Sequence, residues 1–153
     1  MFLYLVQHAE SLSKEMDQTQ PLSEKGKNDI NRLADSLFKL KIPLDQIIHS
    51  TKLRARQTAE VLGAKLNPPQ GYSEQEGLSP LDEPMIWLKG ILAMNKNLML
   101  VGHLPHLEKL ISLVLGFAPE KKTVSFQRGC CVCLKKEESG SWSIQWMIVP
   151  EII

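Results

Sequence analysis

An unbroken apolar run near the start of the chain constrains the fold more than any other feature. Residues 2–6 read Phe-Leu-Tyr-Leu-Val, and the polar pair Gln7-His8 follows directly. A continuous β-prone run is typical of a strand that is covered on both faces, as in the sheets of α/β proteins. Ligands of such sheets bind beyond the carboxyl ends of the strands, so a functional group is expected at His8. The alternative is a loop histidine without a role.

Strand and helix patterns alternate along the rest of the chain, separated by a polar loop over residues 10–20 and an irregular segment over residues 70–84. The expected strands are residues 2–6, 44–49, 98–101, 123–134 and 142–149. The expected helices are residues 24–40 after an N-cap at Ser23, 52–65, 85–95 and 105–117 with Pro105 as first helical residue. This order predicts an α/β fold, a three-layer sandwich whose largely parallel sheet has an antiparallel edge. No long linker divides the chain, so we expect one domain over residues 1–153.

Charge and hydropathy argue against several classes of partner. The net charge of +1 gives no electrostatic reason to expect nucleic acid or an anionic membrane. Residues 110–117 are the most apolar later stretch, but Ser112 and Gly116 interrupt it, so no membrane span is expected. The apolar run at the start is too short for a signal peptide and has no basic region before it.

Three cysteines, Cys130, Cys131 and Cys133, form an odd and tightly spaced group rather than a disulfide framework. Neighbouring residues on a strand point to opposite faces, which disfavours a metal site shared by Cys130 and Cys131. We interpret all three as small strand residues in a reducing compartment, and therefore expect a cytoplasmic protein.

Three expected strands end in polar residues that would meet at one edge of the sheet. These ends carry Gln7-His8, Ser50 and Gly102-His103. The helix after Ser50 opens with Lys52, Arg54 and Arg56, where the helix dipole disfavours positive charge. Arg56 can pair with Glu60 one turn later, but Arg54 has no acidic residue at that spacing. A bound anion at the helix start would offset this cost for Arg54.

His103 and His106 form a His-x-x-His pair, which raises the alternative of a zinc site. Zinc needs a third and usually a fourth ligand, and Pro105 does not aim the two rings together, so we expect no metal. Two histidines and an arginine from separate segments instead favour phosphoryl chemistry. One histidine can attack phosphorus while the other groups hold the equatorial oxygens, without a metal or an organic cofactor.

Four segments resemble the histidine phosphatase superfamily, and in particular its small phosphohistidine phosphatases of the SixA type. They are Leu5–Glu10, Pro21–Gly26, Ser50–Ala59 and Val101–Pro105. The resemblance implies a phosphoglycerate mutase-like fold. It also implies that His8 is the catalytic nucleophile, transiently phosphorylated, and that Arg54 and the second histidine, His103, bind the phosphate.

The chain departs from the family pattern in two ways. Gln7 and Ala9 stand where the family has the arginine and the glycine of Arg-His-Gly. Gln7 can still donate a hydrogen bond to phosphate, but losing a charge-assisted bond costs roughly 1.5–3 kcal/mol, or about 10- to 100-fold in rate. The acid that larger members supply before the third helix is also not evident among Glu76, Asp82 and Glu83. Glu83 is the candidate acid.

We therefore expect a phosphohistidine phosphatase that acts on a phosphorylated protein, such as a histidine phosphotransfer domain or a sugar-transport carrier. A phosphoramidate leaving group depends less on an enzymic acid than a sugar alkoxide does. Three alternatives remain open: a catalytically weak or inactive phosphate- or phosphoprotein-binding module, a small-molecule phosphomonoesterase of the same superfamily, and a metal-binding module.

Overall fold

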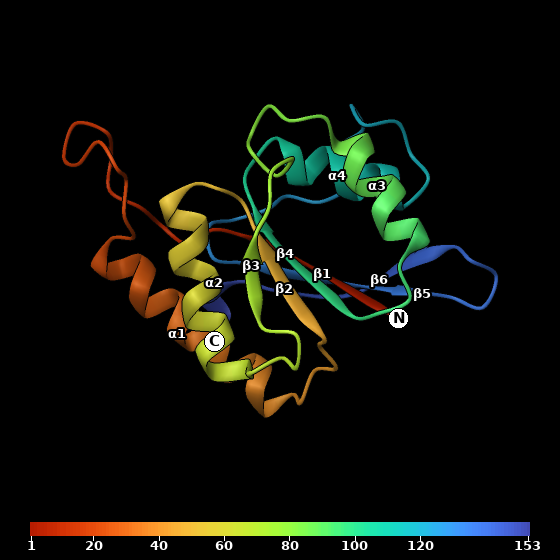
Figure 1. Ribbon diagram of the computed structural model, residues 1–153, viewed down its shortest axis with the longest axis horizontal. Coiled ribbons are helices and arrows are strands. Elements are labelled where there is room, and N and C mark those ends of the chain that lie inside the picture. Colours follow the sequence, from red (N-terminus) through yellow and green to blue (C-terminus); the bar gives the residue numbers. More distant parts are fainter.

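A six-stranded sheet lies between two helical layers in the computed structural model, which describes residues 1–153 (Figure 1). The strand order is β3-β2-β4-β1-β5-β6, and the four strands β1 to β4 are parallel while β5 and β6 are antiparallel. The strands are β1 Phe2–Gln7, β2 Gln46–His49, β3 Tyr72–Glu74, β4 Leu98–Gly102, β5 Cys131–Lys136 and β6 Trp142–Ile148. The helices are α1 Glu24–Lys39, α2 Leu53–Leu66, α3 Pro84–Ala93, α4 His106–Val114 and the 3₁₀ turn η1 Pro150–Ile152. The predicted three-layer α/β class is confirmed.

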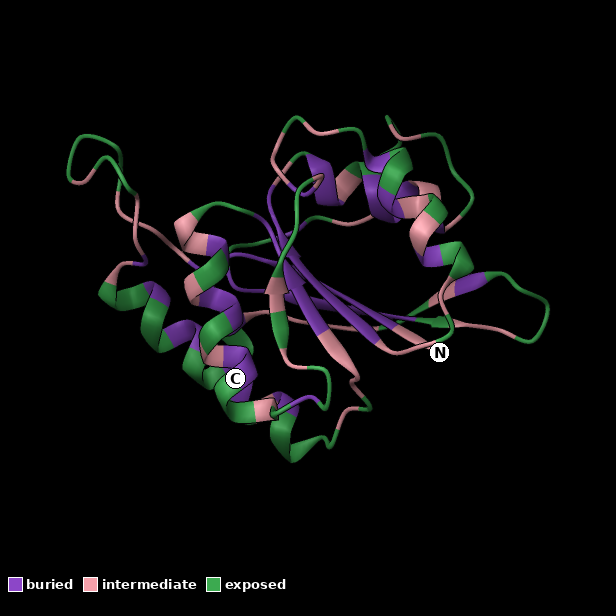
Figure 2. Ribbon diagram, in the orientation of Figure 1, coloured by how far each residue is buried: buried purple, intermediate pink, exposed green.

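Strand β1 lies inside the sheet, with parallel β4 on one side and antiparallel β5 on the other. Leu3 and Leu5 pack into the core cluster beneath α3 and α4, whereas Tyr4 and Val6 pack into the cluster beneath α1 and α2. All four side chains are buried, as Figure 2 shows for the central strands. The continuous apolar run therefore follows from burial on both faces of the sheet.

Two predictions for the segment before β5 and for the edge of the sheet are wrong. The expected strand over residues 123–134 begins only at Cys131, because the chain before it turns across the end of β1. In this turn the amide of Gly129, at φ +74, donates to the carbonyl oxygens of Gln7 and His8. The segment expected to be irregular contains β3, a three-residue edge strand whose polar residues carry no strand pattern.

Helix α4 is displaced from its predicted limits at both ends. Pro105 is the N-cap of the helix rather than its first residue. The helix ends at Val114 rather than Phe117 because the chain leaves the helical conformation at Gly116, which has φ +82. None of the helices is long and apolar enough to cross a membrane.

The three cysteines are buried and unpaired. Cys130 belongs to the core cluster beneath α3 and α4, whereas Cys131 and Cys133 belong to the cluster on the other face, as the alternation predicts. Burial raises the pKa of the Cys130 thiol to about 11 and that of Cys133 to about 12, so both remain protonated at neutral pH.

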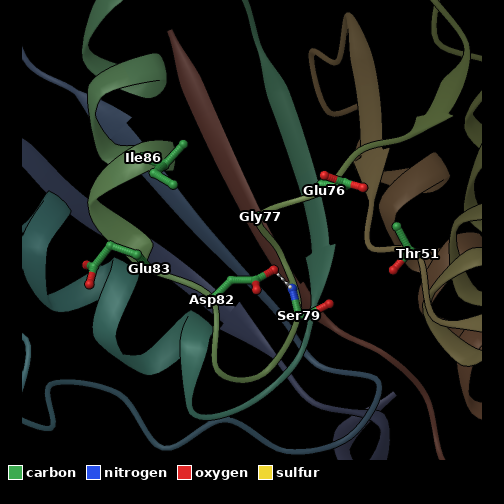
Figure 3. A pocket seen from close by; sticks show the side chains of 7 residues that line it. All are labelled: Thr51, Glu76, Gly77, Ser79, Asp82, Glu83 and Ile86. Carbon is green, nitrogen blue, oxygen red and sulfur yellow. Dashed lines mark hydrogen bonds between the residues drawn. The ribbon is translucent and has the colours of Figure 1, made fainter.

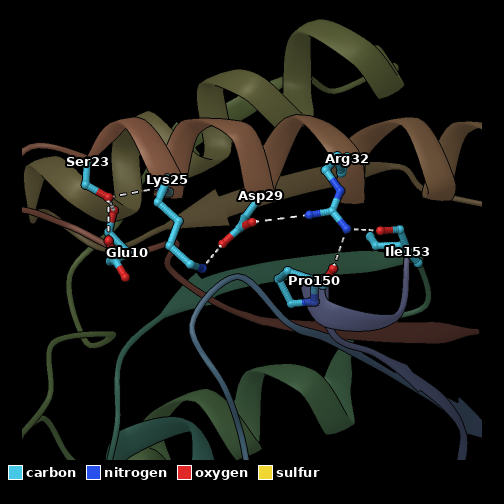
Figure 4. A network of polar contacts seen from close by, with 8 residues as sticks. Glu10, Ser23, Lys25, Asp29, Arg32, Pro150 and Ile153 are labelled. Carbon is cyan, nitrogen blue, oxygen red and sulfur yellow. Dashed lines mark hydrogen bonds and ion pairs between the residues drawn. The ribbon is translucent and has the colours of Figure 1, made fainter.

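Helix α1 holds the segment that follows β1. Ser23 caps the helix by accepting from the amide of Gly26 at 3.0 Å, and its hydroxyl also donates to the Glu10 carboxylate at 2.8 Å (Figure 4). The Ser23 amide donates to the Glu10 carbonyl oxygen at 2.9 Å. Two turns later, Arg32 donates to the carbonyl oxygen of Pro150 at 2.7 Å (Figure 4). The same helix thus contacts the segment after β1 and the end of the chain.

Gly26 permits this close contact, and we expect Gly26→Ala to destabilise the fold by about 1–3 kcal/mol. A Cβ at this position would lie 2.0 Å from the Glu10 carbonyl oxygen, so the helix or the segment after β1 must shift. Gly90→Ala in α3 is the matched control: a Cβ there has no neighbour within 4 Å, and alanine favours the helix by about 0.5–1 kcal/mol. Urea unfolding measures both changes. Equal stability of the two variants would contradict the packing argument.

Candidate active site

His8, Arg54 and His103 meet at the carboxyl end of the parallel strands. His8 directly follows β1, His103 directly follows β4, and Arg54 lies in the first turn of α2, which follows β2. The ring centroids of the two histidines are 4.9 Å apart, with the planes tilted by 54°. Arg54 Nε donates to His8 Nε2 at 3.3 Å. The structure therefore brings together three residues that are far apart in the sequence.

The orientation of the His8 ring is set by its own backbone. Nδ1 lies 2.7 Å from the carbonyl oxygen of Ala9, which can only accept, so the proton of the neutral ring resides on Nδ1. The Nε2 lone pair therefore faces Arg54. Burial, together with the charges of Arg54 and Arg128, lowers the pKa of His8 to about 4, although its hydrogen bond to Ala9 acts in the opposite direction. At neutral pH the ring is an uncharged base whose Nε2 lone pair accepts a hydrogen bond from Arg54.

His103, which follows β4, is held by Ser50, which follows the neighbouring strand β2. Its Nε2 lies 2.5 Å from Ser50 Oγ, which in turn accepts from the amide of Lys52 at 3.2 Å. The other ring nitrogen, Nδ1, is buried without a hydrogen-bond partner. Burial first, and then the neighbouring His8, Arg54 and Lys52, lower the pKa of His103 to about 3. Both rings are therefore neutral at pH 7.

Thr58 fixes Arg54 relative to the His8 segment. Its hydroxyl donates to the Arg54 carbonyl oxygen at 2.8 Å and accepts from the Ala9 amide at 3.1 Å. Thr58 is buried, so these bonds are shielded from water. By contrast, Arg56 pairs with Glu60 at 3.7 Å on the half-exposed surface, as its spacing predicts.

Gln7 is buried beside His8, and its Oε1 has no hydrogen-bond partner.

Sequence reasoning missed one further residue, Arg128, which lies in the turn that binds the backbone of Gln7 and His8. Its charge contributes to the lowered pKa values of both His8 and Arg54. The strand predicted over residues 123–134 would place Arg128 in its interior. The glycine at position 129 is the signal in the sequence for a turn at this point.

The candidate acids lie on the loop that leads into α3. Glu76, Asp82 and Glu83 line a pocket with Thr51, and Asp82 Oδ2 accepts from the Ser79 amide at 2.8 Å (Figure 3). The Glu83 carboxylate caps α3 by accepting from the Met85 amide at 3.3 Å. In Figure 3 its side chain points away from Thr51 and Glu76. No contact tests a role of Glu83 as an acid, and that role stays a prediction.

The His-x-x-His pair is divided between two environments. His103 contacts Ser50, whereas His106 is buried and both of its ring nitrogens lack hydrogen-bond partners. No three histidine, cysteine or acidic side chains lie together in a group that could hold a metal ion.

Comparison with known proteins identifies relatives along the whole chain. Phosphohistidine phosphatase SixA of Escherichia coli (strain K12) is 24% identical over 152 residues, which are 98% of this chain and 94% of that protein. An uncharacterized protein of Picosynechococcus sp. is 37% identical over 116 residues, which are 70% of this chain and 68% of that protein. The solved structure of the protein histidine phosphatase SixA complexed with tungstate shares the fold, with a TM-score of 0.86 at 22% identity over 99% of each chain.

The family model of the histidine phosphatase superfamily (branch 1) matches residues 3–82, more than half of the chain. The matched region contains β1 with His8, and the start of α2 with Arg54. The chain therefore belongs to the histidine phosphatase superfamily, branch 1, and is a phosphatase.

Proposed function

We propose that this phosphatase removes phosphate from a phosphohistidine of another protein, in two steps through phosphorylated His8. The observation that carries the proposal is the His8 ring, whose Nε2 lone pair faces the Arg54 guanidinium while Nδ1–H is bound to Ala9. A ring with an unprotonated Nε2 can attack at neutral pH without a separate base, once the phosphoryl group takes over the Arg54 donor. The similarity to phosphohistidine phosphatase SixA over 98% of the chain supports this choice of substrate.

In the first step, His8 Nε2 attacks phosphorus as the P–N bond to the substrate histidine breaks. The substrate imidazole leaves with the bonding electron pair, and Arg54, His103 and Gln7 bind the equatorial oxygens, where negative charge is concentrated. In the second step, water attacks phospho-His8, orthophosphate is released, and the Nε2 lone pair is restored. Neither step requires a metal or an organic cofactor.

Two of the three candidate acids are engaged in hydrogen bonds of their own loop and helix, which supports phosphohistidine over a phosphoester. Asp82 is bound to the loop amide of Ser79, and Glu83 caps α3. An imidazole leaving group can take a proton on its other ring nitrogen, whereas an alkoxide needs an acid in the site. A small-molecule phosphomonoesterase is the second candidate. A strong preference for sugar phosphates that Glu83→Gln abolishes would favour it over our proposal.

The proposed substrate is a histidine phosphotransfer domain or a similar phosphorylated carrier, so the reaction would end a phosphorelay signal. We place it in the cytoplasm, which the three unpaired, buried cysteines support.

The third candidate is a phosphate- or phosphoprotein-binding module without turnover, which the uncharged Gln7 favours. Labelling of His8 separates this module from the enzyme.

We expect label from a ³²P-phosphohistidine protein to appear transiently on His8 and then as orthophosphate. His8→Ala removes the attacking nitrogen and should lower turnover by at least about 10³-fold. The reaction is quenched in base, where phosphohistidine survives, and the labelled residue is identified by peptide mass spectrometry. Arg56→Gln, on the outer surface of α2, is the control with unchanged turnover. Undiminished turnover by His8→Ala would refute the mechanism. Phosphate binding without label on His8 would indicate the binding module.

We also expect the His8 imidazole to stay neutral from pH 8 down to about pH 5. Its pKa is lowered to about 4, so protonation consumes the lone pair, and activity is lost, only as the pH falls through that value. ¹⁵N NMR of the ring nitrogens measures this titration. Arg54→Gln removes one of the lowering charges, so the pKa of His8 should rise but stay below 6.5, since burial is the main cause. A wild-type titration near pH 6.5 would contradict the neutral nucleophile.

A further inference from the structure

The turn that carries Arg128 is fixed to the backbone around His8. The amide of Gly129 donates to the carbonyl oxygens of Gln7 at 3.1 Å and His8 at 3.2 Å, and the Cys130 amide closes the turn on Gln127 at 3.1 Å. Gly129 also lies against its neighbours: a Cβ there would be 3.3 Å from Pro150 Cγ and 3.8 Å from Ala9 Cα. Arg128 is therefore held one residue away from a direct backbone contact with His8.

The sheet topology brings Arg128 and Arg54 toward His8 from opposite sides. In the order β2-β4-β1-β5, Arg54 follows β2, whereas Arg128 precedes β5 on the other side of β1. Strand β5 is antiparallel to β1, and Cys131 is paired with Val6, so β5 begins at the carboxyl end of β1. The region in front of His8 Nε2 thus lies between the segments that carry the two arginines.

Arg128 has no counter-ion in the protein. Its side chain is exposed, and it takes part in none of the ion pairs or side-chain hydrogen bonds of the structure. Its charge instead lowers the pKa of the Arg54 guanidinium and that of the His8 imidazole. Two cations that repel each other are stabilised when an anion lies between them.

Gln7 carries no charge at a position where the family pattern has a cation. It occupies the position of the arginine in the family pattern, and its buried Oε1 accepts from no donor. The phosphate site therefore lacks one cation on the β1 side, and a buried acceptor there remains unsatisfied. A guanidinium has five donors and no acceptor, so it suits both the phosphoryl oxygens and an amide oxygen.

We propose that Arg128 binds the phosphoryl group opposite Arg54 and supplies, from the turn before β5, the charge that Gln7 lacks. This inference rests on the phosphate site of the proposed function, to which it adds a binding residue from a different segment. Arg128 contacts the equatorial oxygens through its fork of N–H donors, and Gln7 is left as an uncharged donor or acceptor beside it.

Binding of tungstate, an oxyanion that mimics phosphate, tests the proposal by isothermal titration calorimetry. We expect Arg128→Gln to weaken tungstate binding about 10- to 100-fold, the size of a lost charge-assisted contact. Arg128→Lys keeps the charge but loses the fork, and we expect a several-fold weakening. Arg56→Gln removes a cation of the same charge from the outer surface of α2, where it pairs with Glu60, and should bind tungstate like the wild type.

Restoring an arginine at position 7 tests whether the two positions substitute for one another. We expect Gln7→Arg to recover tungstate binding in the Arg128→Gln background, with a smaller gain in the wild-type background, since neighbouring groups that serve one ligand are coupled. Wild-type affinity of Arg128→Gln would overturn the proposal. So would an Arg128→Lys variant that binds as tightly as the wild type, or an equal gain from Gln7→Arg in both backgrounds. Tungstate binding needs no turnover, so these outcomes are independent of whether phosphohistidine is the substrate.

Discussion

Burial of β1 on both faces is the constraint on which the rest of the structure depends. Its side chains enter two separate core clusters, one beneath each helical layer, so the strand cannot shift without disturbing both. Its register with β4 and with β5 determines which residues emerge at the carboxyl edge. His8 is the residue at which this burial ends, which places a polar side chain at the edge of a rigid sheet. The packing of β1 in the core therefore also fixes the position of His8.

The electrostatics of the site follow from the same burial. The ring centroids of His8 and His103 are 4.9 Å apart, and burial, together with the neighbouring cations, keeps both rings neutral. The positive charge is instead carried by guanidinium groups, which stay protonated under all ordinary conditions. In the proposed mechanism, His8 provides the lone pair that attacks phosphorus, whereas Arg54 provides positive charge. A phosphoryl group needs both, one to form a bond and the other to bind oxygens.

The sequence allowed β1, β4 and the apolar stripes of the helices to be predicted because each depends on residues close together in the chain. Burial of β1 follows from five consecutive apolar residues, and the convergence of His8, Arg54 and His103 follows from the parallel order of the strands. The position of Arg128 could not be predicted in this way. It depends on backbone bonds from Gly129 to Gln7 and His8, near the other end of the chain, and no local pattern encodes such a contact. Strand β3 was missed because its three residues, Tyr72 to Glu74, are too few to form a strand pattern in the sequence.

Helix α1 contacts both segments that flank His8, although it contributes no residue to the site. Its first turn binds Glu10, two residues after His8, and Arg32 in its middle binds Pro150, which packs against Gly129 on the other flank. The helix therefore reinforces a connection between these two segments that the amide of Gly129 already makes. A substitution that displaces α1 is therefore expected to disturb the backbone on both sides of His8, although the helix lies outside the site.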